Sequence, residues 1–227
     1  MFRSITSSTR VVILAALLGA GLTANANAQG KDSGYLKDYA QLQSEKDPLG
    51  VERRMWVSSK FTQANYQKAL VEPISFYPAP KASDQVSMGV LNDIRTYSDS
   101  DLRKAFAAVV PLATAPGPGV LRLRMALTAV AVEGFKLKPY QLVPVALVFT
   151  GAKEATGQSK RDVRLFVEAE ITDSVSGEPL ARFVREAKGI QVASDGKLTL
   201  KDAKPQIDKW AQAVQQFLAA RLTPGGK

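Results

Sequence analysis

Apolar and polar residues alternate most regularly between residues 162 and 188, and this stretch predicts a β-hairpin. Every second position from Val163 to Ile171 is apolar, and most positions between them are charged, as in a strand with one buried face. Residues 174–177 read Ser-Val-Ser-Gly, and short polar side chains followed by a glycine favour a tight turn. A return strand over residues 180–188 completes the hairpin.

Two registers fit this hairpin. A three-residue loop sets Glu170 opposite Arg182. A four-residue loop, with Asp173 opposite Glu178, turns the return strand over, because a shift of one residue exchanges the two faces of a strand. We prefer the first register because it pairs opposite charges across the strands.

Two further strands precede the hairpin. Residues 68–77 predict one strand, and Pro73, which has no N–H, places it at a sheet edge or marks a bulge. Residues 120–132 alternate leucines and Met125 with arginines and small residues, which predicts a second strand with one buried face.

Helical periodicity covers two other segments. Apolar residues keep helical phase from about 85 to 110, with Ser83 or Asp84 as the cap. The polar stretch 98–100 allows two helices, but one helix with a weak centre is preferred. A last helix opens at Asp202 and Pro205. Its apolar stripe consists of Ile207, Trp210, Ala211, Val214, Phe217, Leu218 and Leu222.

These elements predict a single α/β (α+β) domain over residues 61–222. Its mixed four-stranded sheet includes the hairpin, and both helices pack on one face while the opposite face is charged. Residues 133–161 form a long excursion, with a short helix near 145–155 that begins at Pro144. Residues 189–200 are expected to be irregular, with a small strand at 197–200, and residues 223–227 form a disordered tail.

The N-terminal 60 residues divide into two parts. Residues 1–28 have an arginine-containing start, a short apolar run and a small-x-small ending, which predicts a signal peptide cleaved between Ala28 and Gln29. An uncleaved anchor and a buried core helix are the alternatives. Residues 29–60 form an N-terminal arm, either a short helix or an ordered segment around 35–42, with Trp56 as a packing anchor.

The predicted leader implies export to the periplasm or the periphery of the outer envelope, with a soluble chain after cleavage. No run in the mature chain is long and apolar enough to predict a transmembrane span. The formal net charge is +9 and the basic residues are scattered, which suits an unknown envelope protein or an anionic envelope polymer or lipid as partner. A nucleic-acid partner is not expected, since no recognised binding motif is present.

The residue inventory excludes several chemistries. The chain has no histidine and no cysteine, so a Ser-His-Asp triad, a thiolate nucleophile and the usual zinc sites are excluded. We therefore expect no cofactor and no metal site. The remaining catalytic candidate is a carboxylate pair, Glu168 and Glu170, which lie about 7 Å apart on one strand face and could serve glycoside hydrolysis.

A charge ladder is the simpler interpretation of that face. Several arginines are predicted beside the two glutamates, and opposite charges across strands stabilise a sheet. The candidate partner face, in full, is Arg122, Arg124, Arg164, Glu168, Glu170 and Arg182.

Four segments resemble a family of exported bacterial proteins known as domain of unknown function 3313. They are residues 34–39 (GYLKDY), 72–74 (EPI), 116–123 (PGPGVLRL), and 173–178 (DSVSGE) followed by Leu180-Ala181. The resemblance implies envelope localisation and no activity, cofactor or catalytic residue. Many members look like lipoproteins with a lipid-bearing cysteine, where this chain has alanine and glutamine.

We therefore expect a non-catalytic exported cell-envelope protein, an accessory or binding component that presents its charged sheet face or residues 133–161 to a partner. One alternative is a cell-wall polymer hydrolase that uses the carboxylate pair. Another is binding of anionic lipid or lipopolysaccharide through diffuse positive charge.

Overall fold

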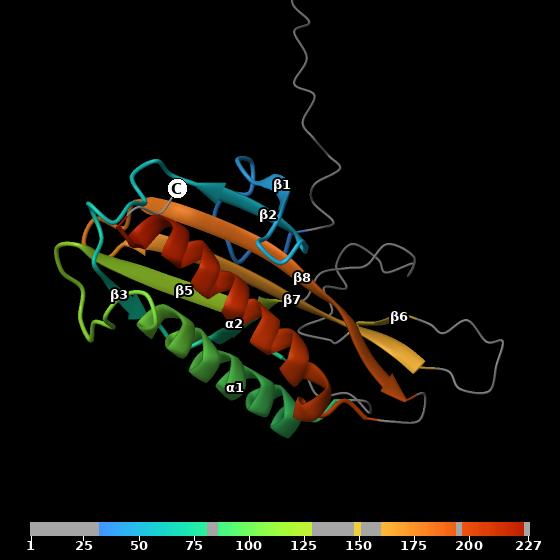
Figure 1. Cartoon of the computed structure of the whole chain (residues 1–227). Coiled ribbons are helices and arrows are strands. Elements are labelled where there is room, and N and C mark those ends of the chain that lie inside the picture. Colours follow the sequence, from blue (N-terminus) through green and yellow to red (C-terminus); the bar gives the residue numbers. More distant parts are fainter. Residues whose placement is uncertain (1–31, 81–85, 129–147, 151–159, 194–196, 225–227) are drawn as a thin grey trace, which may run out of the picture.

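A computed structural model describes residues 32–80, 86–128, 148–150, 160–193 and 197–224. One mixed sheet carries two helices, α1 and α2, side by side on one face (Figure 1). The strand order is β1 (Gln43–Lys46), β2 (Glu52–Val57), β8 (Pro179–Ala193), β7 (Lys160–Asp173), β5 (Val120–Thr128) and β3 (Lys68–Val71), with β4 (Ser75–Tyr77) also paired to β5 and β6 (Val148–Thr150) to β7. The predicted class, an α+β domain with a mixed sheet and two helices, is confirmed, and the sheet is wider than the four strands expected.

The predicted hairpin is formed by β7 (Lys160–Asp173) and β8 (Pro179–Ala193), the two longest strands. Glu170 lies opposite Arg182, as the preferred register requires. A bulge between Ile171 and Thr172 shifts the pairing by one residue, so that Asp173 faces Glu178 at the turn, where its N–H donates to the Glu178 carbonyl at 2.9 Å. Each register thus holds over part of the hairpin, and the bulge joins them.

The predicted strand 68–77 is split into β3 (Lys68–Val71) and β4 (Ser75–Tyr77), which both run parallel to β5 (Val120–Thr128). Pro73 lies in the break, as expected for a residue that cannot donate to a ladder. The freed Ile74 N–H donates to the Asp99 carboxylate of α1 at 3.0 Å. The polar centre of the predicted helix therefore secures the strand break.

The helix α1 (Met88–Ala107) runs unbroken through its polar centre, as preferred, and Asp99 is ion-paired with Arg103 one turn later. Its N-cap is Ser87, whose side chain accepts from the Val90 N–H, so the predicted cap at Ser83 or Asp84 was wrong. A cap must directly precede the first helical turn, and the helix begins later than its apolar periodicity suggested.

The helix α2 (Leu200–Leu222) begins two residues before its predicted opening. Thr199 and Asp202 form a capping box, which satisfies N–H groups of the first turn. Pro205 lies inside the helix, where it removes one backbone donor near the N-terminal end. The predicted apolar stripe is largely confirmed, and the buried residues are Ala203, Ile207, Trp210, Ala213, Phe217, Leu218 and Leu222.

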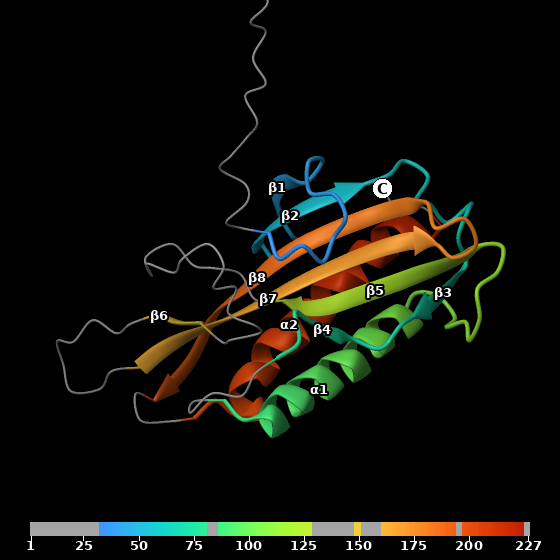
Figure 2. The same cartoon turned by 180° about the vertical axis from the view of Figure 1, so that it is seen from behind.

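The N-terminal arm contributes two strands that had not been predicted as parts of the sheet. β1 (Gln43–Lys46) and β2 (Glu52–Val57) form a hairpin around the turn that starts at Asp47, and β2 pairs with β8. Residues 32–42 contain no helix and cross the sheet face opposite α1 and α2 (Figure 2). We call residues 32–42 the N-terminal strap.

Two smaller predictions were wrong. Within 145–155, residues Val148–Thr150 form a strand, β6, paired with β7, because this β-prone triplet finds a partner in the long extension of the hairpin. β8 runs on to Ala193 where irregular chain was expected, and residues 197–199 contain no strand. The predicted signal peptide, Ala28, Gln29, most of the excursion and the end of the tail lie outside the described residues.

We expect the Asp173→Ala variant to lose about 1–3 kcal/mol of unfolding free energy at pH 7, since hydrogen bonds to a charged acceptor are lost. One Asp173 carboxylate oxygen accepts from the Val175 and Ser176 N–H groups, and the other accepts from the Tyr66 hydroxyl. These bonds lower the pKa of Asp173 below its ordinary value of 3.8.

A carboxylate with a lowered folded-state pKa stabilises above its unfolded pKa, and the contribution is lost as the pH falls through the folded value. The penalty of Asp173→Ala should therefore shrink when urea unfolding is repeated at pH 3. The control is Glu178→Gln, at an exposed ion pair with Lys60 that is worth less than about 1 kcal/mol. An equal penalty at both pH values would contradict the assignment.

Candidate functional site: the strap-covered face and the sheet–helix pocket

Five of the six residues predicted for the partner face, all but Arg164, lie on one face of the sheet. Cross-strand partners share a face, and the register aligns Arg124, Glu170, Arg182 and Trp56 in one row across four strands. Glu168 lies in the adjacent row, between Ala126 and Val184. The sequence thus located these residues correctly relative to each other.

The strap covers this face and buries its carboxylates. Glu168 has 0% exposure, and its two oxygens accept from the Ser33 N–H at 3.2 Å and from the Tyr39 hydroxyl at 2.5 Å. Thr128 donates a longer bond of 3.4 Å to the same carboxylate. Burial and the bond to Glu168 raise the pKa of Tyr39 to about 12, so the phenol stays protonated and keeps donating.

The second carboxylate of the pair is also bonded. Arg182 donates to Glu170 at 2.9 Å and to Asp38 of the strap at 3.1 Å, and its guanidinium lies 5.6 Å from the Trp56 ring centre. Glu170 and Arg182 are 7% and 8% exposed, so this is a buried pair tied to the strap. Trp56 is a packing partner of that pair.

The remaining members of the predicted face have separate roles. The Arg124 guanidinium lies 5.6 Å from the centre of the Tyr35 ring, a third contact to the strap. Arg122 is half exposed and ion-paired with Glu72 on the sheet edge. Arg164 stands opposite Val148 in the β6–β7 ladder, and its side chain lies outside the described part. In the described ranges, no acidic cluster is arranged to hold a metal ion.

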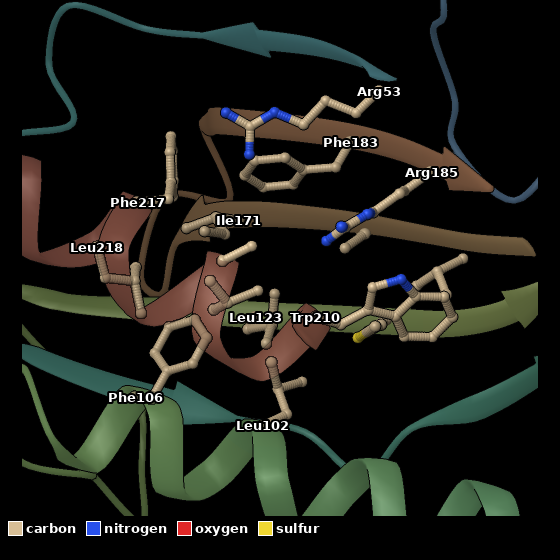
Figure 3. A pocket seen from close by; sticks show the side chains of 15 residues that line it. Arg53, Leu102, Phe106, Leu123, Ile171, Phe183, Arg185, Trp210, Phe217 and Leu218 are labelled. Carbon is tan, nitrogen blue, oxygen red and sulfur yellow. The ribbon is translucent and has the colours of Figure 1, made fainter. Parts of the chain in front are cut away.

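A pocket of about 70 Å³ lies on the other face, between the sheet and α2 (Figure 3). Its floor comes from β5, β7 and β8, its roof from α2, and Leu102 and Phe106 of α1 close one side. Nearly all of the lining is apolar, and Arg53 and Arg185 are the charged exceptions. We call it the sheet–helix pocket. Its lining includes Met125, Ala169, Phe183, Trp210, Ala213 and Phe217.

Two arginines of neighbouring strands form the polar wall of this pocket. Arg53 of β2 lies directly opposite Arg185 of β8, and each side chain is only 10% exposed. Arg53 donates to Glu45 at 2.8 Å, and its guanidinium lies 5.4 Å from the Phe217 ring centre. Figure 3 shows both guanidinium groups on the same side of the pocket.

Arg185 is incompletely satisfied. Its Nη2 lies 2.6 Å from the buried Asp47 carboxylate, but this ion pair lacks hydrogen-bond geometry, and among the described residues Nε has no hydrogen-bond partner. Burial, and secondarily the neighbouring Arg53, lower the pKa of Arg185, while Asp47 opposes the change. The Trp210 Nε1–H, 5% exposed as a residue, likewise has no acceptor in the described part of the chain.

Sequence reasoning missed this pocket, although one signal was present. In the preferred register Ala181, Phe183 and Arg185 share the helix-covered face, so a buried arginine on that face could have been inferred. Arg53 could not, because β2 had not been predicted to be part of the sheet. Ala169 and Ala213 are the smallest side chains that line the pocket, and the other lining residues are larger.

Several solved structures are distantly similar. A putative neuraminyllactose-binding hemagglutinin homologue from Helicobacter pylori covers 82% of this chain and 90% of its own, at 10% identity and a TM-score of 0.42. The PelC dodecamer from Paraburkholderia phytofirmans covers 72% and 96%, at 16% identity and a TM-score of 0.33.

Sequence comparison is more informative. The uncharacterized lipoprotein YdcL of Escherichia coli K12 is 33% identical over 214 residues, which cover 93% of this chain and 96% of YdcL. The model of the family described as "Protein of unknown function (DUF3313)" matches residues 31–214. The predicted resemblance is thereby confirmed, and the chain belongs to the DUF3313 family.

Proposed function

We propose that this protein is a non-catalytic binding component of the bacterial cell envelope, with the sheet–helix pocket as its ligand site. Export is supported by the N-terminal sequence pattern and by the lipoprotein name of the Escherichia coli relative. Neither described helix is apolar enough along its length to cross a membrane.

The observation that carries the proposal is the contrast between the two sheet faces. On the strap-covered face, Glu168 and Glu170 are buried and bonded, so their geometry is that of structural carboxylates. On the other face, a largely apolar pocket holds two polar groups that lack full partners, Arg185 Nε and Trp210 Nε1. An apolar cavity with a few oriented polar groups is the usual form of a small-ligand site.

This proposal changes the expected location of binding. The charged face was expected to meet a partner, but the strap occupies it, and most of residues 133–161 lie outside the described part. Binding of anionic lipid is the second candidate function. The pair of arginines in the pocket wall favours it. Their positive charge is localised, whereas the sequence predicted binding through diffuse positive charge.

The hydrolase alternative can be tested directly on purified peptidoglycan. We expect the protein to release no soluble fragments, and Glu168→Gln to leave that result unchanged while lowering the unfolding free energy. A hydrolytic carboxylate pair must be reached by substrate and water, and these two side chains are 0% and 7% exposed. Fragment release that disappears in Glu168→Gln would establish the hydrolase.

A structural role of Glu168 also makes Tyr39 important for stability. In Tyr39→Phe the buried carboxylate loses its closest donor, and the N–H groups of Gly34 and Leu36 lose their acceptor. We expect a loss of about 1–3 kcal/mol in urea unfolding, with faster proteolytic cleavage in the strap. The control is Tyr97→Phe, where an exposed hydroxyl donates to Asp208 at 2.7 Å and the loss should be smaller. Equal losses of unfolding free energy in Tyr39→Phe and Tyr97→Phe would contradict this structural role of Tyr39.

The pocket can be tested by filling it. Ala213→Val adds two methyl groups at a buried α2 position that lines the pocket, so we expect stability to change by less than about 1 kcal/mol. Ala203→Val makes the same change at a buried α2 position outside the pocket and should cost about 1–3 kcal/mol by overpacking. Urea unfolding measures both, and equal penalties would show that no usable space exists at Ala213.

A further inference from the structure

We propose that the sheet–helix pocket takes the end of an alkyl chain whose anionic head group, a carboxylate or a phosphate, binds Arg53 and Arg185. The inference rests on the proposed function, and it names the chemical class of the ligand. Three features of the pocket carry it: its arginines, its apolar interior and its size.

The two arginines repel each other, and the carboxylates beside them leave Arg185 Nε without a hydrogen-bond partner in the described part of the chain. Like charges directly opposite each other on neighbouring strands repel, and both guanidinium groups are largely removed from water. A third guanidinium, that of the partly buried Arg221, lies 4.8 Å from the centre of the Phe217 ring, against which Arg53 also packs. Among the described residues, the carboxylates that face these three arginines are Glu45 and Asp47.

The two carboxylates do not satisfy the cluster. Glu45 is bonded to Arg53 and is itself 40% exposed. Asp47 uses one oxygen to accept from the Leu49 and Val51 N–H groups, and the other approaches Arg185 without hydrogen-bond geometry. An entering carboxylate or phosphate can accept from Arg185 Nε in the planar geometry that guanidinium groups favour. An ammonium head group has no acceptor to offer, and a neutral hydroxyl accepts only a weaker hydrogen bond without charge assistance.

The interior of the pocket selects an apolar and slender group. Besides the lining residues already named, the pocket is lined by the apolar side chains of Phe106, Leu123, Val167 and Ile171. The volume of about 70 Å³ is roughly half that of an apolar cavity of about 150 Å³ known to bind benzene. An aromatic or sugar ring is therefore too wide, whereas the last few methylene groups of an alkyl chain fit.

The chain provides its own reporter for this site. Its two tryptophans lie on opposite sheet faces, Trp210 in the pocket wall and Trp56 beside Arg182. Trp56→Phe therefore leaves one tryptophan, whose fluorescence reports on the pocket. Four probes share a six-carbon chain and differ in the head group: hexanoate, hexyl phosphate, 1-hexanol and hexylammonium.

We expect hexanoate, hexyl phosphate or both to change Trp210 fluorescence saturably, at least tenfold more tightly than hexanol, with no binding of hexylammonium. A tenfold difference in affinity between hexanoate and hexyl phosphate identifies which head group the site prefers. Calorimetric titration of the protein with both tryptophans gives the same comparison if Trp56→Phe does not fold.

Variants then locate the head group and the tail. Arg185→Gln should weaken binding of the anionic probe at least tenfold, and Ala213→Val should abolish it by filling the pocket. Arg122→Gln, at a half-exposed arginine paired with Glu72 on the other face, is the matched control and should bind normally.

The outcomes separate the inference from the proposed function. If hexanol binds as tightly as hexanoate, or if Arg185→Gln binds the anionic probe normally, the anionic head group is rejected. The proposal that the pocket binds a ligand is then still supported. No response to any of the four probes, in fluorescence and in calorimetry, overturns the alkyl-chain inference as a whole. Failure of the non-catalytic proposal has a different signature, the release of peptidoglycan fragments described above.

Discussion

A fully buried carboxylate must be supplied with hydrogen-bond donors, and at Glu168 two of them come from a segment more than 120 positions away in the sequence. Because Ser33 and Tyr39 provide those donors, the strap is held on the sheet. Asp38 adds an ion pair with Arg182 beside them. Without the strap, this polar face of the sheet would be exposed to solvent. With the strap in place, its carboxylates are buried.

Because the strap is bonded to one face, the two faces of the sheet are stabilised by different interactions. The face under α1 and α2 is held by apolar packing, which leaves a pocket lined in part by Ala169 and Ala213. The face under the strap is held by directional bonds, which define where the strap lies. A ligand site is therefore more readily accommodated on the apolar face, since a small void there leaves no hydrogen bond broken.

The sequence by itself determined the hairpin, both amphipathic helices, the polar face and, at Pro73, either a sheet edge or a bulge, because these follow from local periodicity and from turn and proline chemistry. It could not determine that Tyr39 closes over Glu168 or that Arg53 meets Arg185. Those contacts join segments with no periodic relation to each other, and β2 had to pair with β8 before either arginine gained a neighbour. The pocket, too, was decided only by tertiary packing, since a void depends on which small side chains of separate elements come to face each other.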